Sequence, residues 1–158
     1  MQRRITKEVV VPAKRADVWR AWTTSEGARE FFAPAARIEL RLGGPYELLF
    51  VPDAPEGGKG SEGCKVLAFV ENEMLSFDWN GPPQFPFART GQKTFVVVRF
   101  DDAPGGGTRV RIDHAGWPEA AEWNAVYEYF DRAWGAVVTW LTERYEKGPL
   151  DWSKRDLR

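Results

Sequence analysis

The sequence predicts a single α+β domain in which a curved antiparallel sheet of about seven strands surrounds a long C-terminal helix. Short segments of alternating apolar and polar residues, separated by turns rich in Gly and Pro, predict the strands. One long segment near the C-terminus carries aromatic residues at spacings of three and four, which is typical of an amphipathic helix. Because helices do not alternate with the strands, we expect an antiparallel sheet and not a doubly wound one.

The N-terminal quarter of the chain predicts a strand followed by two short helices. Residues 3–11 alternate between apolar and polar side chains, as in a half-buried strand. A short amphipathic helix is expected over residues 15–24. A second is expected over residues 26–32, with Ser25 as its N-cap. The two helices therefore interrupt the sheet after its first strand.

The middle of the chain predicts the remaining strands and two long loops. The expected strands cover residues 38–42, 46–50, 64–70, 74–79, 94–100 and 108–115. Gly, Pro and charged residues over 53–63 and 81–92 predict loops. The second loop contains Phe85 and Phe87, which a purely solvated connection would not need. We therefore expect this loop to fold over an apolar part of the domain.

The C-terminal part predicts one long helix over residues 119–147, which ends at Gly148 and Pro149. Residues 149–158 form a charged tail that can be flexible. No repeat or second domain is visible, so one domain over residues 1–158 is expected.

The composition narrows the classes of function. Lys and Arg total 22 against 23 for Asp and Glu, a formal net charge of -1, so nucleic acid is not an expected partner. Neither a signal peptide nor a membrane-spanning segment is apparent, which favours a cytoplasmic protein without membrane insertion. One cysteine and one histidine are too few for a structural zinc site, so neither a metal nor another cofactor is expected, and Cys64 is interpreted as reduced and packed.

Several short motifs occur in an order that resembles a known family. These are Pro12-Ala13, Val18-Trp19, Gly43-Gly44, Gly107-Thr108, His114-Ala115-Gly116 and Trp134-Gly135. With the order of elements, they resemble the family named after the activator of the heat-shock protein ninety ATPase, within the START-like, helix-grip (SRPBCC) superfamily. The birch-pollen-allergen fold and the polyketide cyclases belong to the same superfamily. The resemblance covers nearly the whole chain and implies a cavity between the sheet and the terminal helix. It implies no single reaction, because lipid or polyketide binding, cyclase-type chemistry and chaperone contact all occur among relatives.

Aromatic side chains are the expected walls of this cavity. Eight tryptophans and ten phenylalanines favour a pocket with stiff apolar walls, although such rings could equally fill the space. The candidate ligand-binding residues are Trp79, Phe85, Phe87, His114, Trp123, Tyr127, Phe130 and Trp134. The candidate polar rim comprises Tyr46, Asn80, Gln92 and Asn124.

His114 is the only candidate catalytic residue. It shares a strand face with Val110 and Ile112, so it is expected to point into the domain. It could be a hydrogen-bonding or acid/base group for a ligand carbonyl, or a core histidine whose ring is satisfied by a hydroxyl or backbone group. No second catalytic residue can be named, so enzymatic activity stays open.

Three hypotheses of function follow. The leading one is binding of a small hydrophobic or aromatic molecule between the sheet and the terminal helix. The second is a cyclase or hydrolase that uses His114 in the same cavity. The third is a module that contacts a chaperone or forms a homodimer through the sheet face or the loop over residues 81–92.

Overall fold

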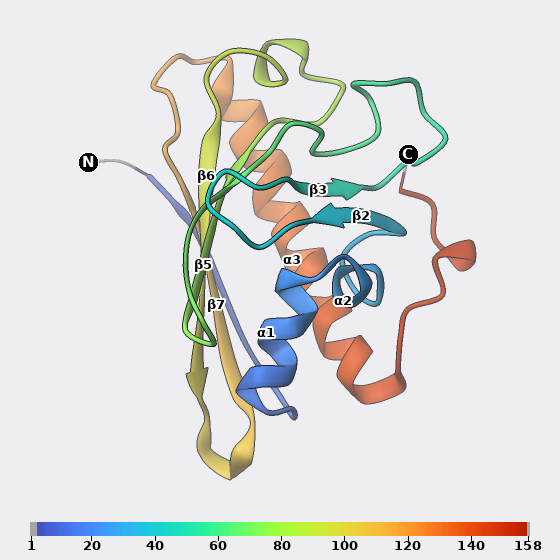
Figure 1. Cartoon of the computed structure of the whole chain (residues 1–158). Coiled ribbons are helices and arrows are strands. Elements are labelled where there is room, and N and C mark those ends of the chain that lie inside the picture. The colour runs from blue at the N-terminus through green and yellow to red at the C-terminus, as the bar shows by residue number, and fades with distance from the viewer. Residues whose placement is uncertain (1–2, 158) are drawn as a thin grey trace.

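Five strands form the main antiparallel sheet in the computed structural model, which describes residues 3–157 (Figure 1). Their order across the sheet is β1-β7-β6-β5-β4, with every neighbouring pair antiparallel. The strands are β1 (Ile5–Val11), β4 (Val66–Val70), β5 (Met74–Trp79), β6 (Thr94–Asp102) and β7 (Thr108–Ala115). The predicted antiparallel arrangement is confirmed.

The remaining two strands, β2 (Ala35–Ile38) and β3 (Tyr46–Leu49), form a separate two-stranded sheet. The Tyr46 N–H donates to the Cys64 carbonyl over 2.8 Å, so this hairpin continues the edge of the main sheet beside β4. Residues 3–157 therefore contain seven strands, as predicted, but these divide into a sheet of five and a sheet of two. The long loop between β3 and β4 leaves only isolated bridges at the junction, and these do not make a continuous ladder.

Two short helices follow β1, namely α1 (Arg15–Thr23) and α2 (Ser25–Arg29). The prediction of Ser25 as N-cap is wrong. Thr24 has the extended backbone of a cap, and its hydroxyl accepts the Gly27 N–H over 2.9 Å. Ser25 lies inside the helix, where its hydroxyl accepts the Ile38 N–H over 2.8 Å and fixes the start of the hairpin.

The long helix α3 (Trp123–Lys147) lies along one face of the main sheet (Figure 1). It begins at Trp123, later than predicted, because the preceding residues form a tighter turn in which the Trp123 N–H donates to the Ala120 carbonyl. At its C-terminus Gly148 has a φ of +92° and donates to the Arg144 carbonyl over 3.0 Å. Short 3₁₀ turns cover Pro86–Ala88, Pro104–Gly106 and Trp152–Lys154.

Aromatic rings from four parts of the chain meet between the sheet and α3. Trp22 of α1 packs on Phe31 and Phe32, at ring-centroid distances of 5.1 and 5.3 Å. Phe32 continues the cluster to the sheet and to α3. Tyr46 of β3 stacks on Phe77 of β5 at 4.0 Å. The core is thus built from large rings that hold the short helices, the hairpin, the sheet and α3 together.

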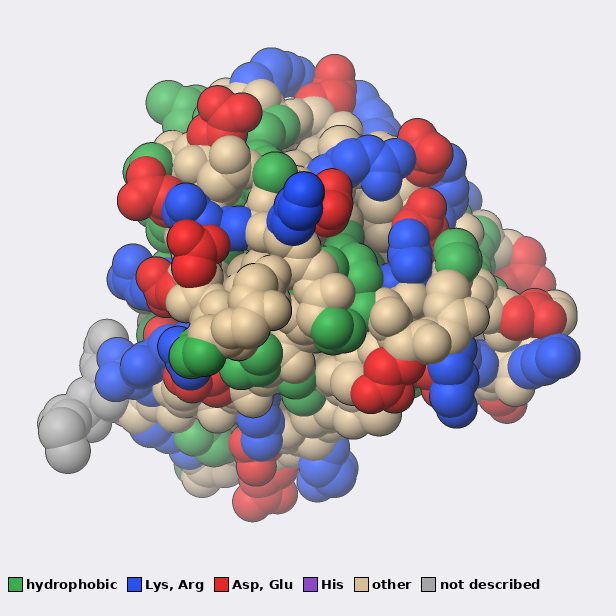
Figure 2. Space-filling view, turned by 90° about the horizontal axis from the view of Figure 1, so that it is seen from below, with side chains coloured by type: hydrophobic (Ala, Val, Ile, Leu, Met, Phe, Trp, Pro, Cys, Tyr) green, Lys and Arg blue, Asp and Glu red, His purple; other side chains and the backbone are tan. Residues whose placement is uncertain are grey.

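The surface carries both signs of charge. Figure 2 shows acidic and basic side chains interspersed over one face of the molecule, in agreement with the near-zero net charge of -1. Within residues 3–157, no helix is long and apolar enough to cross a membrane.

Replacing Tyr46 with Phe tests the junction between α1 and the hairpin. The buried Tyr46 hydroxyl donates to the Trp22 carbonyl over 2.7 Å, and this carbonyl lies in the last turn of α1, where helical partners are lacking. We expect Tyr46→Phe to lower the free energy of unfolding by about 1–3 kcal/mol in urea titrations, because the carbonyl stays buried without a donor. Tyr127→Phe is the control, since its exposed hydroxyl bond to Arg4 should contribute less. Equal losses in both variants would contradict the prediction.

Candidate functional site

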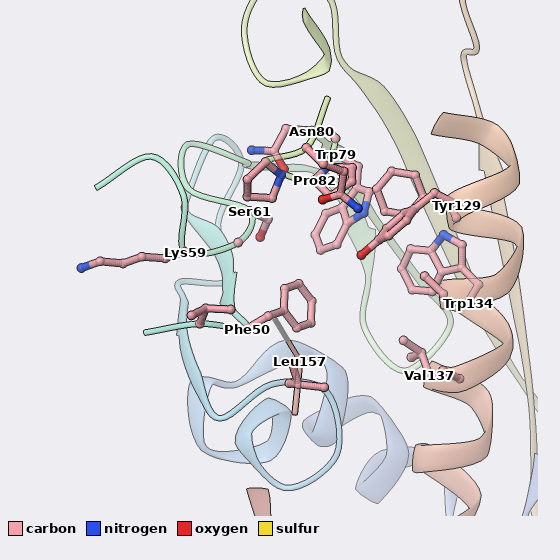
Figure 3. Close-up of a pocket in the computed structure, with 18 of the residues that line it drawn as sticks. Phe50, Lys59, Ser61, Trp79, Asn80, Pro82, Tyr129, Trp134, Val137 and Leu157 are labelled. Carbon is pink, nitrogen blue, oxygen red and sulfur yellow. The ribbon is translucent and has the colours of Figure 1, made fainter. Parts of the chain in front are cut away.

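An open pocket of about 710 Å³ lies beside α3, between the helix and two loops. The first loop follows β3 and covers residues 50–61, and the second is the segment 79–84 after β5. Residues 156–157 close a further side. Figure 3 shows Tyr129, Trp134 and Val137 of α3 on one side of the pocket, with Phe50 on the other.

Three aromatic rings form the floor of this pocket. Phe32 lies 5.8 Å from Trp134 and 6.1 Å from Trp79, and the two tryptophans are 5.8 Å apart, measured between ring centroids. Trp134 comes from α3 and Trp79 from the end of β5, so Phe32 occupies the space between helix and sheet. The rings therefore fill the centre of the domain and leave the opening at its edge.

Beside the buried face of α3, a stripe of side chains on the same helix borders the opening. Tyr129, Ala133, Ala136 and Trp140 line the pocket and follow one another at spacings of four, three and four, so they share one side of the helix. The two alanines in the middle of the stripe carry only a methyl group. Consequently a trough lies along the helix between the rings of Tyr129 and Trp140.

The opposite wall is a polar loop folded around Glu62. Its carboxylate accepts backbone N–H bonds from Gly57, Lys59 and Gly60, at 2.7, 3.1 and 2.7 Å. Burial acts to raise the pKa of Glu62, but these backbone donors outweigh it, so the pKa lies below its usual value. At Gly60 a Cβ would lie 2.0 Å from the Leu48 carbonyl oxygen, so only glycine fits. The loop is thereby held in one shape at neutral pH.

Arg89 ties this loop to the segment after β5. Its Nη1 donates to the carbonyls of Gly60 and Gly81, at 2.6 and 2.8 Å. Its Nη2 donates to the Gly57 carbonyl and lies 3.2 Å from Glu62 Oε1. Since the guanidinium group is engaged on both sides, Arg89 serves as a clamp on the pocket wall.

His114 takes part in a buried hydrogen-bond relay that joins α3 to the sheet. The Trp134 indole N–H donates to His114 Nδ1 over 2.9 Å, and His114 Nε2 lies 2.7 Å from the Thr94 hydroxyl. Thr94 in turn donates to the Trp79 carbonyl over 3.2 Å. Because an indole N–H can only donate, Nδ1 must be the unprotonated nitrogen and Nε2 carries the hydrogen. The relay fixes a neutral imidazole of one tautomer.

The surroundings of His114 keep it neutral. The side chain is fully buried, and burial lowers its pKa from 6.5 to about 3. Protonation of Nδ1 would in addition displace the Trp134 donor. His114 therefore acts as a neutral hydrogen-bonding bridge within the core.

The structure brings together three of the predicted site residues. Trp79, Phe130 and Trp134 line the pocket, whereas His114, Trp123, Tyr127, Phe85 and Phe87 are not among its lining residues. Of the predicted polar rim, Asn80 lines the pocket and Tyr46 is buried in the core. Gln92 and Asn124 are exposed elsewhere. The pocket therefore lies closer to the second half of α3 than the sequence indicated.

Phe85 and Phe87 pack back onto the domain. Phe85 contacts Tyr129 with ring centroids 6.3 Å apart, and Phe87 contacts Trp123 at 5.5 Å. Both rings are half-buried. The loop folds over an apolar surface, as expected, but these rings cover the first half of α3 next to the pocket and do not cover its mouth.

The C-terminal segment is docked on the domain. The Leu150 N–H donates to the Glu30 carbonyl over 2.9 Å, and the Trp152 indole donates to the Arg29 carbonyl over 2.6 Å. Trp152 also packs edge-on against Trp140 at 5.6 Å. These contacts bring Asp156 and Leu157 to the pocket.

Cys64, the single cysteine of the sequence, does not line the pocket. Cys64 is buried, and burial raises the pKa of its thiol to about 12, so it is protonated at neutral pH. Within residues 3–157 no group of His, Cys, Asp and Glu side chains is arranged to hold a metal ion.

The antiparallel sheet, the long C-terminal helix packed on it and the two short helices after the first strand define the helix-grip class of α+β domains. Within this class, the model of the family described as Activator of Hsp90 ATPase homolog 1-like protein matches residues 12–146. The chain belongs to this family, which confirms the resemblance seen in the sequence. The docked segment over residues 149–157 lies beyond the matched residues.

Solved structures share this fold. Protein MLL2253 from Mesorhizobium loti has a TM-score of 0.73 at 20% identity, over 94% of this chain and 100% of that protein. The Aha1 dimer from Colwellia psychrerythraea has a TM-score of 0.68 at 18% identity, covering 92% and 98%. Protein BH1534 from Bacillus halodurans has a TM-score of 0.65 at 26% identity, covering 92% and 99%. None of the curated proteins compared with the chain matches it.

Sequence reasoning missed several pocket residues. The stripe of Tyr129, Ala133, Ala136 and Trp140 could have been found, because its helical spacing is visible in the sequence. No periodic pattern in the sequence indicates that the loop over residues 50–61 and the C-terminal segment line the pocket, because their positions depend on how distant parts of the chain pack.

Lowering the pH tests the neutral state of His114. The pKa of His114 is about 3 in the folded protein and about 6.5 in the unfolded chain, so the unfolded state binds more protons between these pH values. The contribution of His114 to the free energy of unfolding is therefore full above pH 6.5 and falls as the pH drops. Between pH 6.5 and about 5, we expect a slope approaching about 1.4 kcal/mol per pH unit in urea titrations. This is the only histidine, so His114→Gln should remove most of the slope in that range, leaving the small part that carboxylates with lowered pKa values, such as Glu62, contribute near pH 5. A slope of the wild-type size in His114→Gln would refute the assignment.

Replacing Trp152 with Ala tests the docking of the C-terminal segment. Removing its indole bond and its contact with Trp140 should increase hydrogen exchange of the Leu150 amide about tenfold, because about 1.4 kcal/mol of local stability is lost. Hydrogen-exchange mass spectrometry of the terminal peptide measures this. Lys154→Ala, an exposed change in the same segment, should leave the exchange unaltered. Unchanged protection in Trp152→Ala would mean that other contacts hold the segment.

Proposed function

We propose that this protein binds a small hydrophobic or aromatic molecule in the pocket beside α3. The observation that carries the proposal is the contrast between the two stripes of α3: Phe130 and Trp134 pack into the core, whereas Ala133 and Ala136 leave an apolar trough open. A volume of about 710 Å³ lies within the range of about 300–1,000 Å³ usual for ligand pockets.

The alternative of a cyclase or hydrolase receives less support from the geometry. It depends on His114, which does not line the pocket and has both ring nitrogens engaged within the core. A general base must hold a free lone pair within reach of the substrate, and this imidazole has none. Binding therefore explains the arrangement better than acid/base catalysis.

The alternative of an interaction module also receives less support. One surface that this hypothesis invokes is the loop over residues 81–92, and the two large rings of this loop, Phe85 and Phe87, pack inward against α3. The relative from Colwellia psychrerythraea is described as a dimer. Homodimer formation by this chain is compatible with ligand binding and does not replace it as the proposed function.

Filling the trough tests the proposal. In Ala136→Phe, a ring would occupy the space between Tyr129 and Trp140 without replacing a core residue. We expect the wild type to bind 1-anilinonaphthalene-8-sulfonate with enhanced fluorescence, and the variant to bind at least tenfold more weakly at an unchanged circular dichroism spectrum. Native mass spectrometry of the gently purified protein would show bound ligand independently.

The matched control is Ala125→Phe, which places the same ring on an exposed position of α3 away from the pocket. Its affinity for the dye should equal that of the wild type. Equal binding by the wild type and Ala136→Phe, or no binding by the wild type, would reject this pocket as the binding site.

A further inference from the structure

We propose that the ligand carries a hydrogen-bond-accepting oxygen at one end of its apolar body, and that the Trp79 indole N–H and the Tyr129 hydroxyl bind this oxygen. This inference rests on the proposed ligand-binding function and adds the chemical class of the ligand. It starts from two polar groups of the pocket for which residues 3–157 provide no hydrogen-bond partner.

The Trp79 indole is an unpartnered buried donor. Trp79 is only 3% exposed, and its Nε1 makes no hydrogen bond within the part of the chain that the structure describes. A buried N–H without an acceptor is costly and uncommon in native proteins. Trp79 lines the pocket, although its Nε1 atom is itself buried. In the proposed complex the ring turns so that a ligand oxygen in the pocket supplies the missing acceptor.

The Tyr129 hydroxyl is the second free donor. Figure 3 shows it pointing into the pocket, and it forms no hydrogen bond with any residue over 3–157. Burial raises the pKa of Tyr129, and the nearby Arg132 lowers it to a lesser extent, so the phenol stays protonated at neutral pH. Tyr129 can therefore donate, and since the indole of Trp79 can only donate, the shared partner must be an acceptor.

Three polar side chains of the pocket walls are already engaged. The Ser61 hydroxyl accepts the Leu48 N–H at 2.8 Å and donates to the Tyr46 carbonyl at 3.2 Å. Arg89 clamps the two loops. The Lys59 side chain points away from the pocket in Figure 3 and forms an ion pair with Glu56 at 2.9 Å. Arg132, Gln84 and the Trp140 indole also line the pocket and can donate. We select Trp79 because its indole N–H is buried without a partner, and Tyr129 because it lies at the same end of the pocket.

The position of these donors orients the ligand. Trp79 and Tyr129 lie at one end of the pocket, while Val137 and Leu157 lie at the other (Figure 3). An oxygen held by the two donors would place an aromatic or aliphatic body along the trough formed by Ala133 and Ala136. The ligand class is therefore a ketone, carboxylate or similar oxygen compound with one apolar end.

Three naphthalene probes of nearly equal shape distinguish the contribution of the oxygen to the affinity from the contribution of the apolar body. These are 2-ethylnaphthalene, which has no acceptor, 2-acetylnaphthalene, which has a neutral acceptor, and 2-naphthoate, which has a charged one. Their dissociation constants are measured by quenching of tryptophan fluorescence and by calorimetry. We expect both oxygen compounds to bind the wild type about tenfold more tightly than 2-ethylnaphthalene, a difference of about 1.4 kcal/mol.

Variants at the two donors then test their role. Tyr129→Phe and Trp79→Phe each keep a ring but lose the donor, so each should reduce the preference for 2-acetylnaphthalene over 2-ethylnaphthalene several-fold. The preference is a ratio of two affinities, so a general loosening of the pocket affects it little. Tyr129→Phe alters a half-buried side chain and should fold as the wild type does.

Matched controls exist for both changes. Tyr127→Phe removes a hydroxyl from the same helix outside the pocket. Trp22→Phe removes the other unpartnered buried indole N–H found in residues 3–157, which also lies outside the pocket. Neither control should change the preference for the oxygen compounds.

The outcomes distinguish this inference from the binding function. Equal affinity for all three probes, or an unchanged preference in both donor variants, would overturn the inference and leave binding intact. A preference confined to 2-naphthoate and abolished by Arg132→Gln would also overturn it, because a surface charge would then select the ligand. Absence of binding by all three probes would overturn both proposals.

Discussion

The buried relay from Trp134 through His114 and Thr94 to the Trp79 carbonyl links the long helix to the sheet. Each hydrogen bond of the relay has a fixed donor and acceptor, so the relay specifies one tautomer of the histidine. Because Trp134 must reach His114, the relay also specifies one rotation of α3 about its axis. This rotation determines which side chains of α3 enter the core and which line the pocket. The position of the pocket therefore depends on a polar contact deep inside an aromatic core.

The aromatic core explains why the pocket lies at the edge of the domain. A curved sheet around one helix leaves space between them, and here Phe32 fills it by packing against both Trp79 and Trp134. The remaining opening is bounded by loops, which Arg89 and Glu62 hold in place through backbone hydrogen bonds. In the proposed function, the apolar walls bind the body of the ligand, and the Trp79 and Tyr129 donors orient it.

Much of the fold could be predicted because it depends on local pattern. Alternation placed β1 and β7 and turned His114 inward, and the three-to-four spacing identified α3 as the helix that carries Trp134. Errors occurred where two neighbouring residues competed for one role. Thr24 and Ser25 can both cap a helix, and only the distant Ile38 N–H decides that Ser25 serves the hairpin.

The sequence by itself determined the class of fold, the aromatic character of the interior and the lack of strong charge. Tertiary structure alone decided which rings fill space and which enclose it. Phe130 and Ala133 differ by less than one helical turn and both border the pocket, yet Phe130 is buried in the core and Ala133 is only half-buried. Periodicity reports that a residue faces the interior, but whether that interior is packed or open depends on side chains such as Phe32 and Leu157, which arrive from distant parts of the chain.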